Sequence, residues 1–194
     1  MRFFRYNRTV KRILLYGLDD AAADRTQIIL ERIGIAAYII GDDVLDENVD
    51  EVFNAQEDFD GRHQEFSSAF LLFDGMKPEE LLPVLQELEI HGQPFDGVKI
   101  MLNQTNAGWT FRKLFEETYR EHELAKKVLV LQELISSCSG INVSNADNKS
   151  KSEFRRSLVD ALTVLKSGSY NEEAVDNAIH NLTESMKGVR KLYN

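Results

Sequence analysis

The stretch that decides the fold is Phe70-Leu71-Leu72-Phe73-Asp74-Gly75, and an earlier stretch, Ile13-Leu14-Leu15-Tyr16-Gly17, resembles it. Each is a short apolar run with an aromatic side chain that ends at glycine, which is typical of a buried β-strand. In both copies, apolar residues at helical spacing and then a second apolar run follow: residues 28–34 and 36–40, and residues 81–88 and 98–102. Each copy therefore predicts a strand, a helix and another strand.

Helix boundary signals agree with this periodicity. Asp19 precedes the first helix as a candidate N-cap, and Gly34 stands where a left-handed residue is expected after its last turn. Pro78 occupies a first-turn position of the second helix, where its missing N–H costs nothing. Local turn chemistry and apolar spacing thus support a helix in each copy.

Two consecutive strand–helix–strand units predict a βαββαβ order, the ferredoxin-like split βαβ arrangement of an α+β domain. The acidic connection between them, residues 42–65, contains apolar residues that suit a short helix: Val44, Leu45, Val49, Val52 and Phe53. If that helix covers the sheet, strands and helices alternate throughout. A Rossmann-like α/β fold with a mostly parallel sheet is therefore the alternative.

The remainder of the chain predicts helices only. A long helical pattern runs from Thr110 to about Ser137, and its second half and two later segments carry apolar residues at heptad spacing. The three apolar stripes are Leu124, Val128, Leu131, Ile135 and Cys138; Phe154, Leu158, Ala161 and Leu165; and Val175, Ile179, Leu182, Met186, Val189 and Tyr193. Three such stripes predict a small bundle that ends in a helical hairpin.

These patterns predict two parts of the chain, an α/β domain over residues 1–125 and a helical extension over residues 126–194. Small polar residues without periodicity, about 139–152, predict a linker inside the extension. The last stripe is long enough that one partner helix need not cover it. Self-association through the C-terminal helices, as a homodimer, is therefore a further expectation.

Composition narrows the class of protein. The chain has 194 residues, a formal net charge of −9 and one cysteine, Cys138, which excludes an intramolecular disulfide. Acidic side chains concentrate between residues 17 and 65, and such a surface repels nucleic acids and anionic membranes, so neither is predicted as a partner. No apolar run is long enough for a signal peptide or a membrane span, and the cytoplasm is the expected location.

Motifs of catalysis and nucleotide binding are missing from the sequence, including the glycine-rich phosphate loops and the H-E-x-x-H metal motif. No catalytic residue, metal ligand or cofactor is therefore predicted. The leading hypothesis is a non-enzymatic interaction or regulatory module that binds a protein partner. The alternative is a small-molecule binding protein or enzyme that takes an anionic metabolite at residues 103–113.

That candidate site follows the last predicted strand and leads into the long helix. Thr110 is a plausible N-cap, which places two cations in the first turn, where they oppose the helix dipole. A bound anion would relieve this conflict, because backbone N–H groups and basic side chains would converge on it. The candidate ligand-binding residues are Asn103, Thr105, Asn106, Trp109, Thr110, Arg112 and Lys113.

A purely structural interpretation of the same loop stays open. Arg112 can pair with Glu116 and Lys113 with Glu117, both four residues along the helix. Trp109 would then fill the core, and Asn106 and Thr110 would serve as caps. On this interpretation the loop is scaffolding for the strand and the helix that it joins.

Several pieces of the chain together resemble a bacterial family known as domain of unknown function 3783. They are Ile13 to Gly17, Phe70 to Gly75, the T-N-x-x-W-T motif from Thr105 to Thr110, and Glu121-His122-Glu123. The resemblance covers about residues 10–125, and the T-N-x-x-W-T motif is its most specific part. Residues 99–103 depart from the pattern, and the tail from residue 139 lies outside it. The family has no established activity, so the resemblance implies that this loop matters without implying a function.

Overall fold

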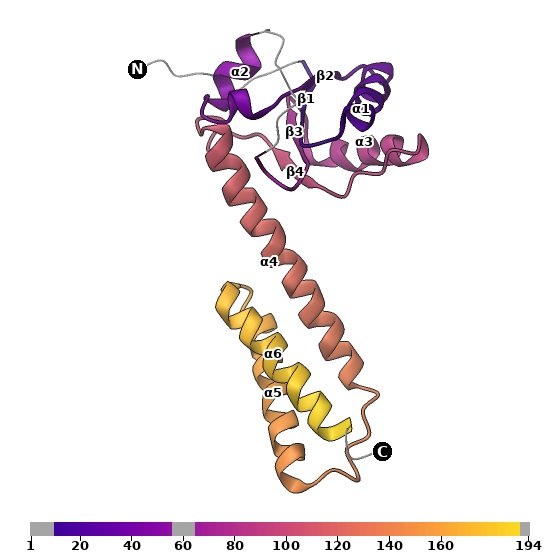
Figure 1. Cartoon of the computed structure of the whole chain (residues 1–194), viewed down its shortest axis with the longest axis vertical. Coiled ribbons are helices and arrows are strands. Elements are labelled where there is room, and N and C mark those ends of the chain that lie inside the picture. The colour runs from indigo at the N-terminus through magenta and orange to yellow at the C-terminus, as the bar shows by residue number, and fades with distance from the viewer. Residues whose placement is uncertain (1–9, 56–64, 191–194) are drawn as a thin grey trace. The chain divides into compact units, whose positions relative to one another are not determined.

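The computed structural model describes residues 10–55 and 65–190. Tyr193, the last residue of the third apolar stripe, lies outside the described residues. The chain divides into two compact units, residues 1–119 and 120–194, and the boundary falls inside helix α4 (Phe111–Cys138). Figure 1 shows the α/β elements of the first unit and the helices of the second.

The first unit is built on a four-stranded mixed sheet with strand order β2-β1-β3-β4. The strands are β1 (Arg12–Tyr16), β2 (Ala36–Ile39), β3 (Phe70–Asp74) and β4 (Val98–Met101). β1 pairs with β2 in parallel and β3 pairs with β4 in parallel, whereas β1 and β3 are antiparallel. The coarse prediction of an α+β fold is confirmed, with parallel and antiparallel pairs in one sheet.

Each predicted strand–helix–strand repeat is confirmed as a parallel strand pair joined by a helix, α1 (Asp20–Arg32) or α3 (Pro78–Ile90). The helices begin where the local chemistry indicated. The Asp19 carboxylate accepts the N–H of Ala22 at 2.8 Å, and the Glu80 carboxylate accepts the N–H of Lys77 at 2.8 Å.

Both faces of the sheet are covered, which explains why the central strands β1 and β3 contain continuous apolar runs. On one face, a cluster that includes Ile13, Leu15 and Phe73 packs against α1 and α3, which lie on the same side of the sheet in Figure 1. On the other face, a cluster that includes Leu14 and Phe70 packs against α2 (Val49–Ala55) and the first turns of α4.

The acidic connection forms the short helix that its apolar residues predicted. A 3₁₀ turn, η1 (Asp42–Val44), precedes α2. All five predicted apolar residues are buried: Val44, Leu45, Val49, Val52 and Phe53. Because these residues cover the second face of the sheet, they belong to the core of the first unit.

The second unit joins the C-terminal part of α4 with α5 (Asn148–Lys166) and α6 (Glu172–Arg190). The three heptad stripes meet in one apolar cluster, in which Val175, Leu182 and Val189 are fully buried. Lys127 of α4 adds ion pairs to Glu172 and Asp176 of α6, each at 2.8 Å. The described part of the α6 stripe is therefore packed inside the chain.

Helix α5 begins inside the segment that the sequence predicted as a linker. Asp147 caps it, because its Oδ1 accepts the N–H groups of Lys149 and Ser150 at 2.9 Å each. The polar residues after Asp147 therefore form the first turn of a helix, and the irregular segment between α4 and α5 is shorter than predicted.

Within the described ranges, no helix combines the length and apolarity that crossing a bilayer requires.

Candidate functional site

The loop after β4 is organised by two asparagine side chains. The Asn103 Oδ1 accepts the N–H groups of Thr105 at 2.8 Å and Asn106 at 3.1 Å, which closes a tight turn. The backbone N–H of Trp109 donates to the Asn106 carbonyl at 3.1 Å and continues the turn toward α4. The two bonds to Asn103 and the bond between Trp109 and Asn106 thus lie within the loop.

Asn106 also reaches back to the end of β4. Its side-chain Nδ2 donates to the Met101 carbonyl at 3.0 Å, and its Oδ1 accepts the Asn103 N–H at 2.8 Å. Both halves of the amide are thus bonded to backbone. The Asn106 amide therefore bonds to the end of β4 and to the first residue of the loop.

The rest of the loop runs beside the acidic connection and bonds to it. The backbone N–H of Val49 donates to the Trp109 carbonyl at 3.0 Å, and that of Asp50 donates to the Ala107 carbonyl at 3.1 Å. In the other direction, the N–H of Phe111 donates to the Glu47 carbonyl at 3.2 Å, and that of Arg112 donates to the Leu45 carbonyl at 2.7 Å. The Asn48 side chain adds a bond to the Gly108 carbonyl at 3.2 Å. Asn48 and Thr110 also form an isolated antiparallel bridge. This junction, residues 45–50 against 107–112, ties the two connections of the α/β unit together.

The junction also accounts for the N–H groups of the first turn of α4. Those of Phe111 and Arg112 bond to backbone carbonyls, and that of Lys113 donates to the Thr110 Oγ1 at 3.4 Å. Thr110 therefore acts as the N-cap that the sequence predicted. Because these three donors already have acceptors, the helix end does not offer them to an anion.

Arg112 binds two carboxylates from the acidic connection. Its Nε and Nη2 donate to the two Asp46 oxygens at 2.8 and 3.3 Å, and its Nη1 donates to Glu65 at 2.6 Å. These hydrogen bonds raise the pKa of Arg112 further and lower the pKa of Asp46. The pair of Arg112 with Glu116 that the structural interpretation suggested is wrong, because the guanidinium instead binds Asp46, a bidentate partner far away in sequence.

Lys113 and Trp109 form a separate contact. The Lys113 ammonium lies 4.4 Å from the centre of the Trp109 ring, within range of a cation–π interaction. Trp109 is partly buried and packs against the cluster that includes Phe111 and Phe115. The Trp109 ring thus packs against the apolar core and also contacts the Lys113 ammonium.

The seven predicted residues therefore fall into three local groups. Asn103, Thr105 and Asn106 make the turn at the end of β4, Thr110 and Arg112 belong to the junction, and Lys113 stacks on Trp109. The distant partners, Asp46 and Glu65 of Arg112 and Asn48 of Gly108, could not be predicted, because nothing in a local sequence pattern links them to this loop.

A buried tyrosine extends this polar network. The Tyr16 hydroxyl donates to Asp42 at 2.6 Å and accepts the N–H groups of Glu65 at 3.0 Å and Phe66 at 3.3 Å. Burial, reinforced by the hydrogen bond to Asp42, raises the pKa of Tyr16 to about 12. The Tyr16 hydroxyl, at the end of β1, thereby contacts both Asp42, at the start of the acidic connection, and Glu65, whose side chain binds Arg112.

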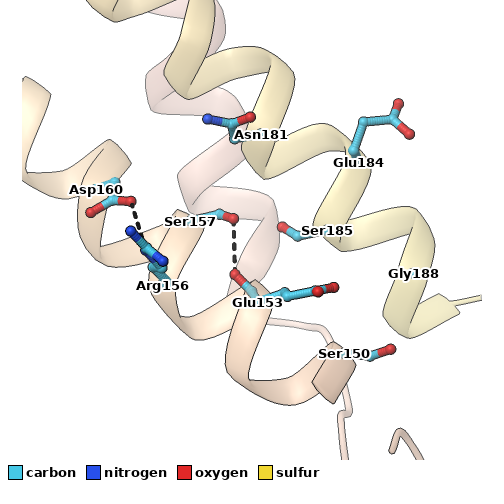
Figure 2. Close-up of a pocket in the computed structure, with 9 residues that line it drawn as sticks. All are labelled: Ser150, Glu153, Arg156, Ser157, Asp160, Asn181, Glu184, Ser185 and Gly188. Carbon is cyan, nitrogen blue, oxygen red and sulfur yellow. Dashed lines mark hydrogen bonds and ion pairs between the residues drawn. The ribbon is translucent and has the colours of Figure 1, made fainter. Parts of the chain in front are cut away.

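A hollow of about 410 Å³ lies between α5 and α6 in the second unit (Figure 2). Its lining is polar and consists of Ser150, Glu153, Arg156, Ser157, Asp160, Asn181, Glu184, Ser185 and Gly188. Ser157 bonds to the backbone of its own helix, and Arg156 faces Asp160 one turn along the same helix at 4.0 Å. These are ordinary contacts of exposed helical surfaces.

In the parts of the chain that the structure describes, no group of three or more histidine, cysteine or carboxylate side chains is arranged to hold a metal ion.

The elements from β3 to the first half of α4 therefore form a connected segment of strand, helix, strand, asparagine turn and capped helix. Residues 69–124 match the family model of Domain of unknown function (DUF3783). The resemblance that the sequence suggested is confirmed over these residues. Neither a curated protein nor a solved structure matches the chain significantly.

The DUF3783 segment contains the whole turn and the N-cap with their own partners, and it contains Arg112, but not the carboxylates that bind Arg112 or the Asn48 side chain that binds the Gly108 carbonyl. Asp46, Asn48 and Glu65 lie before its first residue. The matched segment thus completes its hydrogen bonding with a connection that precedes it in this chain.

Proposed function

We propose that the chain is a non-enzymatic interaction module whose α/β unit is a scaffold that presents helical surfaces to a protein partner. One observation carries this proposal. The polar groups of the DUF3783 loop are bonded to the protein itself, as Arg112 is to Asp46 and Asn106 is to Met101. Polar side chains that are bonded to the protein itself stabilise the fold and its surface, and they are not available to bind or convert a substrate.

The outer surface of α3 is the best candidate for the contact. Leu82 and Ile90 are 62 % and 75 % exposed there, on the helix that lies within the DUF3783 match. Large exposed apolar side chains are costly to leave in water and are useful in an interface. The acidic composition of the chain favours a partner whose surface is basic.

The test is recovery of partner proteins on the tagged full chain, quantified by mass spectrometry. Leu82→Glu combined with Ile90→Glu is compared with the wild type and with Gln132→Glu, which adds a charge at an exposed position of α4, outside the proposed surface. We expect the double variant to lose at least about tenfold of a specific partner, the effect of 1.4 kcal/mol. Equal recovery on all three proteins, with unchanged thermal unfolding, would reject this surface.

A second candidate function is binding of an anionic small molecule at Asn103, Thr105, Asn106, Trp109, Thr110, Arg112 and Lys113. The observation that favours it is the exposed Lys113 ammonium over the Trp109 ring, an arrangement that could orient a carboxylate or phosphate. Because the first-turn N–H groups are engaged, such a site would rest on side chains. Sulfate and phosphate should then raise the melting temperature of the wild type above a chloride control of matched ionic strength, and not that of Lys113→Ala.

Several finer expectations stay proposals with this function. They are an α/β domain over residues 1–125 with a helical extension over 126–194, a bacterial origin, a place in the cytoplasm, and no nucleic-acid or membrane partner. Self-association through the C-terminal helices would use exposed apolar side chains such as Leu129 and Val159, since the α6 stripe is packed internally. Sedimentation of the full chain across a wide concentration range tests it.

The ferredoxin-like assignment of the sheet is also a proposal. The antiparallel pairing of β1 with β3 supports it, whereas the two parallel pairs also suit the alternative, a Rossmann-like fold with a mostly parallel sheet. The parallel neighbours within each repeat count against the ferredoxin-like assignment, because a split βαβ unit has another strand between them.

A further inference from the structure

The outer side of β4 is an edge of the sheet in the part of the chain that the structure describes. The backbone N–H groups of Val98 and Leu102 donate across to Ala69 and Phe73 of the β3 side, each at 2.9 Å. In a strand, neighbouring residues point their backbone groups in alternating directions. The Met101 carbonyl and the Asn103 N–H therefore point away from β3, toward the edge.

Edge groups of this kind are a template for pairing with another strand. In a parallel ladder, one residue of the added strand would donate to the Met101 carbonyl and accept from the Asn103 N–H, opposite Leu102. The Asn106 side chain makes this pair of bonds, at 3.0 and 2.8 Å. Its primary amide has the same donor and acceptor as a peptide group, so it stands in for one residue of a fifth strand.

The position of the Asn106 amide is held by the turn around it. Asn103 binds the N–H groups of Thr105 and Asn106, and its carbonyl accepts the N–H of Ala107 at 3.0 Å. The opposite edge of the sheet has a related feature, because the Gln27 side-chain amide donates to the Ala37 carbonyl of β2 at 2.9 Å. A side-chain amide thus occupies an edge carbonyl on each side of the sheet.

We propose that Asn106 is an edge guard, whose side chain prevents β4 from pairing with the same strand of a second copy of this chain. Three of the four residues of the strand, Val98, Ile100 and Met101, are apolar and of high or neutral strand preference, and Lys99 is the one charge between them. Two copies joined edge to edge would continue the sheet. The asparagine of the T-N-x-x-W-T motif then has a role in keeping copies apart, which is independent of the partner surface on α3.

Asn106→Ala tests this by removing both edge bonds, with Gln104→Ala as the control at an exposed position of the same loop. We expect Asn106→Ala to sediment as a dimer or larger species at concentrations where the wild type and Gln104→Ala do not change. An Asn106→Ala protein that is folded by circular dichroism and sediments like the wild type at every concentration would overturn the proposal.

The variant Asn106→Asp distinguishes the protection of the strand edge from a general loss of folding stability. The carboxylate keeps the acceptor for the Asn103 N–H, loses the donor to Met101, and adds a charge that repels a second edge. We expect it to lose stability as the alanine variant does and yet not to associate. Association equal to that of Asn106→Ala would mean that weakened folding is the cause, which contradicts a guarding role.

A measurement on the wild type covers the case in which the variants do not fold. Hydrogen exchange of the Asn103 backbone amide should be slow, because that N–H is held by the Asn106 side chain although the residue is exposed. Exchange at the rate of an unprotected loop amide would show that the guard is not in place.

Discussion

The Arg112 guanidinium binds Asp46 in a bidentate manner, with Nε to Oδ1 at 2.8 Å and Nη2 to Oδ2 at 3.3 Å. This pair joins the first turn of α4 to the connection between β2 and β3. The planar fork of arginine matches a carboxylate in a way that a lysine ammonium cannot. The two cations in the first turn of α4 therefore have different surroundings, since Lys113 stacks on Trp109.

Replacing Arg112 should lower stability, although the helix dipole alone predicts a gain. Arg112→Ala leaves the Asp46 and Glu65 carboxylates without their shared partner, and we expect a lower melting temperature than for Lys113→Ala. Arg112→Lys should lie between the wild type and Arg112→Ala, because a point charge keeps the attraction and loses the fork. Thermal unfolding of the three variants measures this, and a melting temperature of Arg112→Ala at or above that of the wild type would contradict it.

The same pair should make stability depend on pH in the acid range. Arg112 lowers the pKa of Asp46 in the folded protein, so its contribution is present above the unfolded value of about 4 and is lost as the pH falls through the folded value. Wild type and Asp46→Asn should therefore differ in urea unfolding at neutral pH and converge below about pH 4. A constant difference across this window would show that the charge of Asp46 does not matter.

The contribution of Tyr16 to stability should depend on pH in the alkaline range. Its pKa is about 12 in the folded protein, against about 10 when unfolded, so its contribution is complete below pH 10 and is lost as the pH rises toward 12. Titration of the ultraviolet absorption of tyrosinate should show one late-titrating group that Tyr16→Phe removes.

Tyr16→Phe should also cost about 1–3 kcal/mol, because Asp42 and two backbone N–H groups lose a partner. Urea unfolding at neutral pH measures this cost. A variant as stable as the wild type would mean that water replaces the hydroxyl without loss.

Gly17 should be far less tolerant of a side chain than Gly34. Both have positive φ, +77° and +80°, which costs an alanine about 1–2 kcal/mol. A Cβ at Gly17 would also lie 2.7 Å from the Ser68 carbonyl oxygen, whereas the space around Gly34 is open. We expect Gly17→Ala to lose clearly more stability than Gly34→Ala, measured by urea unfolding. Equal losses would show that the backbone near Ser68 yields.

The sequence by itself determined the elements of this protein. Both strand–helix–strand repeats, the capping by Asp19 and Thr110, and the apolar stripes that form the second cluster followed from spacing and turn chemistry. These features depend on residues within a few positions of one another. Local periodicity and hydrogen bonding are enough to specify them.

Only the tertiary structure decided the direction of β3 and the partners of the loop after β4. The antiparallel pairing of β1 with β3 depends on the path of a long connection, which no short-range pattern encodes. Arg112 had an acceptable partner at Glu116, but the connection brings Asp46 and Glu65 into better geometry. The sequence predicted Asn106 as a ligand group because it lies in the loop between the last strand and the long helix, whose first turn holds two cations that oppose the helix dipole. Its bonds go to Met101 and Asn103 because the turn places its amide against the outer side of β4, the edge of the sheet in the described residues, where backbone groups need a partner.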